Sequence, residues 1–137
     1  MKLTIHRFDL PLRHVFTISR GSTTVSQAVI VELSHDGKSG YGESGHYPYY
    51  GATIDNIIAA IEELRPRLES YQLDDLAALW DELEPELSGN SFAQCALDMA
   101  ASDLWGKLRG QPLWKLWGLE LGDLPPTDYT IGIDTID

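Results

Sequence analysis

The sequence predicts an α+β fold in which a three-stranded antiparallel meander precedes a bundle of helices. Two observations support this: residues 1–45 show the alternation typical of strands, and a helical period follows through residue 118. The length of 137 residues suits one domain with a substantial core rather than two. The net charge of −11 disfavours a partner such as nucleic acid or an anionic membrane surface, because both attract clustered Lys and Arg.

The strands are predicted from side-chain alternation and turn residues. Residues 2–10 roughly alternate apolar and polar side chains, and we expect Pro11 to break this strand. Residues 25–33 are rich in β-branched side chains and form the second strand. The Asp-Gly pair at 36–37 predicts a hairpin turn into a third strand at 39–43.

The first two helices are predicted from apolar residues at helical spacing. The pattern over residues 54–68 has Thr53 as its candidate N-cap, and Pro66 should kink or end this helix. A shorter helix has its apolar face over residues 76–83, is opened by one of the two aspartates just before it and closes before Gly89.

A third helix runs from Asn90 or Ser91 to a stop at Gly110. It is rich in alanine, so another part of the backbone can approach it closely, and we expect it at the centre of the helical layer. Ser91 followed by Gln94 has the spacing of a capping box. Cys95 lies among alanines and is expected to be a small buried residue, and a single cysteine excludes an internal disulfide.

The chain changes character after a short helix at 112–117. Residues 121–126 contain two adjacent prolines and are expected to form a linker. Residues 128–134 then show a strand pattern, yet a lone strand cannot pair its backbone groups. We therefore expect one domain over residues 1–122, and a linker with the first strand of another domain over 123–137.

The most specific motif lies between residues 96 and 118. It reads Ala-Leu-Asp at 96–98, Asp-Leu-Trp-Gly-Lys at 103–107, Gly-Gln-Pro-Leu at 110–113 and Leu-Trp-Gly at 116–118. This pattern resembles a signature of the mandelate racemase and muconate lactonizing branch of the enolase superfamily. Gly-Tyr-Gly-Glu-Ser at 40–44 resembles the third strand of that branch, and the whole chain is similar to its N-terminal capping domain.

The resemblance implies a two-domain isomerase whose capping domain closes over the mouth of a (β/α) barrel. Lys bases and three acidic Mg²⁺ ligands on the barrel would abstract a proton α to a carboxylate, with Mg²⁺ stabilising the enolate. This sequence contains none of those catalytic or metal-binding groups. The tendency of the family to form oligomers leaves a homo-oligomer open.

Two short segments resemble the dipeptide epimerases of this branch. Residues 16–21 resemble their mobile loop, in which Arg20 would bind a substrate carboxylate through its planar guanidinium. Asp128-Tyr129-Thr130 resembles the start of their first barrel strand, where Thr130 would hydrogen-bond the substrate. The structural alternatives are a solvated surface Arg and an ordinary β-branched strand residue.

The tyrosine-rich segment 46–51 resembles the second capping loop of the family, which closes over the distal part of the substrate. Tyr47 and Tyr49 are its candidate contacts, since an aromatic ring with a polar tip suits this role. Which tyrosine meets substrate stays open, and the alternative is a turn that packs on the meander.

The expected function is therefore the substrate-specificity domain of an epimerase that acts on a dipeptide such as L-Ala-D/L-Glu. An o-succinylbenzoate synthase or a muconate cycloisomerase of the same branch remains an alternative, as does a stand-alone binding domain without chemistry. Asp98 and Asp103 do not share a helix face, so we expect them to bind backbone groups or Lys107 or Arg109 rather than to form a catalytic pair. The lack of a long apolar run or cleavage signal indicates a cytoplasmic protein.

Overall fold

The computed structural model describes residues 1–120, 122, 125–130 and 133. An antiparallel sheet has the order β1-β2-β3, formed by β1 (Lys2–Ile18), β2 (Gly21–His35) and β3 (Lys38–Gly45). It is followed by the 3₁₀ helix η1 (Pro48–Tyr50) and by α1 (Ile54–Glu63), α2 (Arg65–Ser70), α3 (Leu76–Leu87), α4 (Ser91–Arg109) and α5 (Leu113–Leu116). The predicted meander followed by helices is confirmed.

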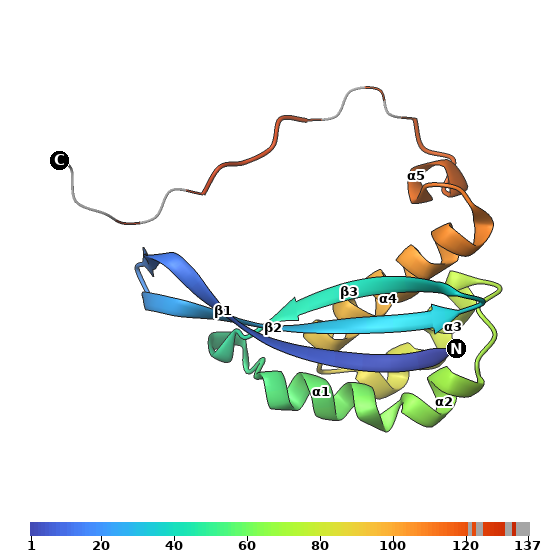
Figure 1. The fold of residues 1–137 in the computed structure, drawn as a ribbon, viewed down its shortest axis with the longest axis horizontal. Helices are drawn as coiled ribbons and strands as arrows, with labels where there is room; N and C mark the ends of the chain where they lie inside the picture. Colours follow the sequence, from blue (N-terminus) through green and yellow to red (C-terminus); the bar gives the residue numbers. More distant parts are fainter. Residues whose placement is uncertain (121, 123–124, 131–132, 134–137) are drawn as a thin grey trace.

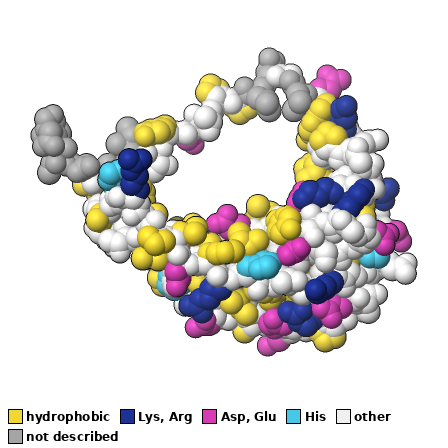
Figure 2. All heavy atoms as spheres, in the orientation of Figure 1, with side chains coloured by type: hydrophobic (Ala, Val, Ile, Leu, Met, Phe, Trp, Pro, Cys, Tyr) yellow, Lys and Arg dark blue, Asp and Glu magenta, His cyan; other side chains and the backbone are white. Residues whose placement is uncertain are grey.

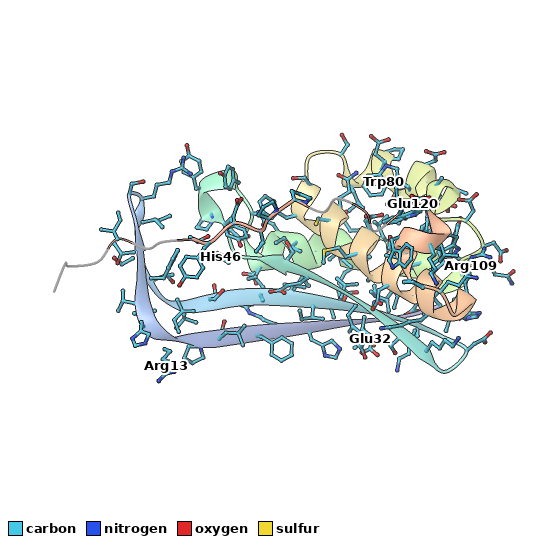
Figure 3. All side chains as sticks on the ribbon, turned by 90° about the horizontal axis from the view of Figure 1, so that it is seen from above. Arg13, Glu32, His46, Trp80, Arg109 and Glu120 are labelled. Carbon is cyan, nitrogen blue, oxygen red and sulfur yellow. The ribbon has the colours of Figure 1, made fainter. Side chains whose placement is uncertain are left out.

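The helices that contact the sheet cover one of its faces (Figures 1 and 3). α4 packs on β2 and β3, α1 on β2, and α2 on β1. The core between these layers is aliphatic, and burying each such side chain contributes about 1.5–3 kcal/mol. Its fully buried members include Val29, Val31, Leu33, Ile57, Ile61 and Leu104. In the part of the chain that the structure describes, no helix is long and apolar enough to span a membrane.

Side-chain caps start α1, α3 and α4. Thr53 caps α1 as predicted, and Asp75 rather than Asp74 caps α3. α4 is capped by Asn90, whose Oδ1 accepts a hydrogen bond from a backbone N–H of the first helical turn. The predicted capping box of Ser91 and Gln94 is wrong, because the helix starts one residue earlier with Asn90 as its N-cap, and the backbone N–H of Gln94 donates to the carbonyl oxygen of Asn90 (3.1 Å).

The two prolines expected to end an element act differently. Pro66 lies in the first turn of α2, and the long predicted helix divides just before it, as expected. The expected break at Pro11 is wrong: Pro11 pairs with Val25, and β1 continues to Ile18. β1 is an edge strand, where a residue without an N–H is tolerated. Beyond a shift in register between Pro11 and Phe16, the paired strands continue as a hairpin arm, residues 12–25 (Figure 1).

α4 lies very close to β3 because two glycines face it. A Cβ atom on Gly42 would overlap the carbonyl oxygen of Ala96, and one on Gly40 would overlap the backbone of Ala100 and Leu104. Ala96 and Ala100 are themselves completely buried. The small residues of the two elements therefore form one contact, and α4 is central to the helical layer as predicted.

The signature residues Asp103 and Lys107 bind the free edge of β3. The backbone N–H of Tyr41 donates to Asp103 Oδ2 (2.9 Å), and Lys107 Nζ donates to the carbonyl oxygen of Ser39 (2.7 Å). One helical turn separates Asp103 from Lys107, and their side chains also pair with each other at 2.7 Å. They satisfy backbone groups that an edge strand leaves open, so the structural role expected for Asp103 is confirmed.

Cys95 is exposed, so its expected burial is wrong. The buried face of α4 carries Ala96 and Ala100, while Cys95 lies on a neighbouring face with Met99, at 3.8 Å between the two sulfur atoms. Alanine neighbours in the sequence do not determine burial here. The direction from which β3 approaches the helix does.

The segment after α5 is described only in part. Residues 122 and 125–130 are exposed and belong to no helix or strand. Of the strand expected over residues 128–134, only 128–130 and 133 are described, and the backbone N–H of Ile133 donates to the carbonyl oxygen of Thr17 (2.9 Å). The remaining residues of this strand and of the linker lie outside the described residues. The strand and the domain boundary at residue 122 thus stay predictions.

Candidate substrate-recognition site

The tip of the hairpin arm meets the tyrosine loop, residues 46–51. Arg20 lies in the two-residue turn between β1 and β2, which confirms its expected place in a loop. Tyr49 lies in η1, which follows β3. The guanidinium carbon of Arg20 is 3.8 Å from the centroid of the Tyr49 ring. The structure therefore brings together two of the candidate site residues from separate segments.

A row of aromatic rings connects this contact to the body of the domain. Tyr49 packs edge-to-face on Tyr50, with 5.0 Å between ring centroids, and the Tyr50 centroid is 6.2 Å from that of Phe92. Phe92 lies in the first turn of α4 and also contacts Tyr47, at 5.6 Å between centroids. Sequence reasoning did not single out Tyr50 or Phe92, because no local pattern indicates that the start of α4 lies against the loop.

The base of the tyrosine loop is held by backbone hydrogen bonds. Tyr47 and Ala52 exchange two of them, with N–O distances of 2.8 and 3.2 Å, and Gly51 permits the turn with a φ of 73°. The backbone N–H of His46 donates to the carbonyl oxygen of Gln27 (3.1 Å). Among the described residues, the buried Nδ1 atom of His46 has no hydrogen-bond partner. The loop thus combines a fixed base with an exposed tip, where Tyr49 is 69% accessible.

The charge of the arm differs from that of the rest of the chain. Residues 10–31 contain Arg13, His14 and Arg20 but no Asp or Glu, in a protein of net charge −11. In Figure 2, acidic side chains gather over the helices, whereas the arm shows basic and His side chains. Arg13 lies at the bend of β1 and points away from His46 (Figure 3). Arg20 is therefore the cation of the arm that lies at the tyrosine loop, and the local field favours an anionic ligand.

Thr130, the remaining candidate, is exposed in the described part of the C-terminal segment. The hydrogen bond between Ile133 and Thr17 brings this segment to the arm. Among the described residues, no hydrogen bond joins Thr130 to Arg20 or Tyr49. The role of Thr130 in binding substrate therefore stays a prediction.

The described residues do not fit a magnesium site. Within residues 1–120, 122, 125–130 and 133, no three His, Cys, Asp or Glu side chains lie close enough together to hold a metal ion. Mg²⁺ needs several oxygen ligands in near-octahedral geometry. These residues therefore include no such set of ligands.

The sheet, the helices on one face and the two loops at one end define a capping domain of the enolase superfamily. Residues 2–118 match the family described as "Mandelate racemase / muconate lactonizing enzyme, N-terminal domain", and the chain belongs to this family. The resemblance noted from the signature is thereby confirmed.

Several of the similar proteins are named epimerases. The L-Ala-D/L-amino acid epimerase of Flavobacterium johnsoniae is 39% identical over the whole chain, which covers 41% of that relative. The L-Ala-D/L-Glu epimerase of Bacteroides thetaiotaomicron is 40% identical over the whole chain, which covers 36% of it. The chain therefore spans about two fifths of the length of these curated relatives.

A solved structure supports the same assignment of fold. The dipeptide epimerase from Methylococcus capsulatus, complexed with Mg and the dipeptide L-Arg-D-Lys, matches with a TM-score of 0.85 at 30% identity. The match covers 97% of this chain and 38% of that one.

Proposed function

We propose that this chain is the N-terminal, substrate-specificity part of a dipeptide epimerase. The enzyme would invert the α-carbon of one residue of a dipeptide by proton abstraction. A C-terminal (β/α) barrel that follows residue 122 would supply the Lys bases and bind Mg²⁺. A cytoplasmic location and assembly into a homo-oligomer belong to the same proposal and rest on the sequence and the family resemblance alone.

The observation that carries the proposal is Arg20, held at the tip of the arm beside the tyrosine loop. A guanidinium presents a planar fork of N–H donors that matches a carboxylate. The arm adds no acidic side chain that would repel an anion. The site therefore favours a dipeptide with an anionic side chain, with Tyr47 of the tyrosine loop closing over it and Thr130 hydrogen-bonding its backbone.

Deuterium exchange in the full-length protein tests this function. The protein is incubated in D₂O with Mg²⁺ and L-Ala-L-Glu, L-Ala-L-Leu or L-Ala-L-Lys, and loss of the α-proton is followed by NMR. We expect exchange at the second residue, fastest for L-Ala-L-Glu, and its loss when EDTA removes the metal.

Two results would overturn the proposal. Synthesis of o-succinylbenzoate without exchange of any dipeptide would favour the neighbouring activity of the same branch. Dipeptide binding measured by calorimetry, again without exchange, would indicate a domain that binds but does not catalyse.

A further inference from the structure

We propose that Tyr49 is a positioning residue, which holds the face of the Arg20 guanidinium so that its in-plane N–H groups stay free for a substrate carboxylate. This inference rests on the proposed function and assigns Tyr49 a different role from that of a direct substrate contact. Tyr49 would act through Arg20, and substrate specificity would depend on the pair rather than on either residue alone.

The geometry of the pair supports this division of roles. The guanidinium carbon lies 3.8 Å from the ring centroid, well within the range of a cation–π contact. The five N–H donors of Arg lie in the guanidinium plane, so stacking its face on a ring uses none of them. The fork that binds a carboxylate therefore remains available while the side chain is held in place.

Tyr49 can hold Arg20 because its own ring is supported. Tyr50 packs against Tyr49 at 5.0 Å between centroids, and Phe92 at the start of α4 lies behind Tyr50 at 6.2 Å. The tip of the arm is supported differently, by contacts within the arm such as the 2.8 Å hydrogen bond between the hydroxyls of Thr17 and Ser22. The Arg20–Tyr49 contact thus joins the exposed arm to a loop that is anchored on the core.

Kinetics of matched variants test the inference in the full-length enzyme. Tyr49→Leu removes the ring and keeps apolar bulk, so KM for L-Ala-L-Glu should rise about two- to fivefold with kcat unchanged. Tyr49→Phe keeps the ring face and should retain the KM of the unmodified enzyme. KM for the neutral L-Ala-L-Leu should not change in either variant.

The double variant with Arg20→Ala completes a double-mutant cycle. Tyr49→Leu should have no further effect on KM once Arg20 is absent. The inference is overturned if Tyr49→Phe is as impaired as Tyr49→Leu, which would indicate a direct contact through the hydroxyl. It is also overturned if Tyr49→Leu acts equally on the neutral dipeptide, or keeps its full effect in the Arg20→Ala background.

Trypsin provides a readout that does not depend on the proposed activity. Cleavage after Arg20 requires the arm tip to open, and its rate follows the population of the open form. Tyr49→Leu should accelerate this cleavage about two- to fivefold, while Tyr49→Phe should not. Cleavage after Lys38, the first residue of β3 at the opposite end of β2, is the internal control.

Failure of the positioning role of Tyr49 and failure of the proposed function would give different results. Equal cleavage rates after Arg20 in all three proteins would overturn the positioning role whatever the enzyme catalyses. Accelerated cleavage in Tyr49→Leu alone, in a protein that exchanges no dipeptide, would support the contact between Arg20 and Tyr49 and contradict the proposed function.

Discussion

The contact between β3 and α4 differs in kind from the contact between the arm and the tyrosine loop. Gly40 and Gly42 meet Ala96 and Ala100 with no room for another atom, and the nearby edge of β3 is bound by side chains of α4. At the other contact, a charged side chain stacks on a ring that is 69% accessible. The first contact depends on excluded volume and backbone groups, and the second on the chemistry of exposed side chains.

This difference separates residues that maintain the fold from residues that recognise a ligand. The signature range 96–118 contains Ala96, Ala100, Asp103 and Lys107, all of which contact β3. Asp103 and Lys107 therefore stabilise the packing of the capping domain and do not form a catalytic centre. If the two groups are separate, substitutions in the contact between β3 and α4 should change stability, and substitutions in the arm should change KM.

Gly42→Ala should destabilise the protein by about 2–3 kcal/mol, because the added methyl group would overlap the backbone of α4. The free energy of unfolding is measured by urea titration followed by circular dichroism. Gly122→Ala is the matched control, since a Cβ atom there would have nothing within 4 Å. Similar stability of the two variants would show that α4 can move away from β3 at little cost.

Arg20→Ala should raise KM for L-Ala-L-Glu about tenfold, the loss of roughly one charge-assisted hydrogen bond, while the free energy of unfolding changes by less than about 0.5 kcal/mol. Steady-state epimerisation and urea titration measure the two quantities. Arg13→Ala removes the same charge at the bend of the same arm and is the control. An equal rise in KM for both variants would indicate a long-range field rather than a contact made by Arg20.

Asp103→Ala should cost about 1 kcal/mol of stability, because the backbone N–H of Tyr41 loses its acceptor and the Lys107 ammonium loses one of its two acceptors. KM for the dipeptide should stay unchanged. Asp81→Ala on the exposed side of α3 corrects for the higher helix propensity of alanine. A changed KM with unchanged stability would indicate that Asp103 takes part in substrate recognition rather than in stabilising the fold.

Asp98→Asn should increase stability near neutral pH. Partial burial next to apolar residues of α3 raises the pKa of the Asp98 carboxyl above its ordinary value of 3.8. The folded state therefore disfavours the charged form of Asp98. This lowers the free energy of unfolding at pH values above the folded pKa, and the effect disappears at pH values below the ordinary pKa. The melting temperatures of the two proteins should differ at about pH 7 and converge at about pH 3.

Glu32→Gln is the control of opposite sign for this pH dependence. The hydrogen bond with His6 (3.0 Å) holds the pKa of the Glu32 carboxyl below its ordinary range. Glu32 thus stabilises the folded state above the ordinary carboxyl pKa, and this contribution is lost as the pH falls through the folded pKa. Glu32→Gln should lower the melting temperature near neutral pH and not at low pH.

Much of the fold follows from local patterns in the sequence. Alternation and the Asp-Gly turn predict the meander, helical spacing predicts the helices, and Thr53 starts α1 because a cap depends only on residues within one turn. The place of Arg20 between two strands is equally local. These features could be predicted because the interactions that produce them join residues close together in the chain.

The features that local patterns did not predict depend on contacts between distant segments of the chain. β1 continues through Pro11 because it is an edge strand, and Cys95 is exposed because β3 approaches a different face of α4. The stacking of Arg20 on Tyr49, and the support of that ring through Phe92, likewise join segments that no local pattern relates. Local patterns predicted most of the elements and identified Arg20 and Tyr49 as separate candidates. Their contact required the packed fold, because only packing sets the distance between side chains that are far apart in the chain.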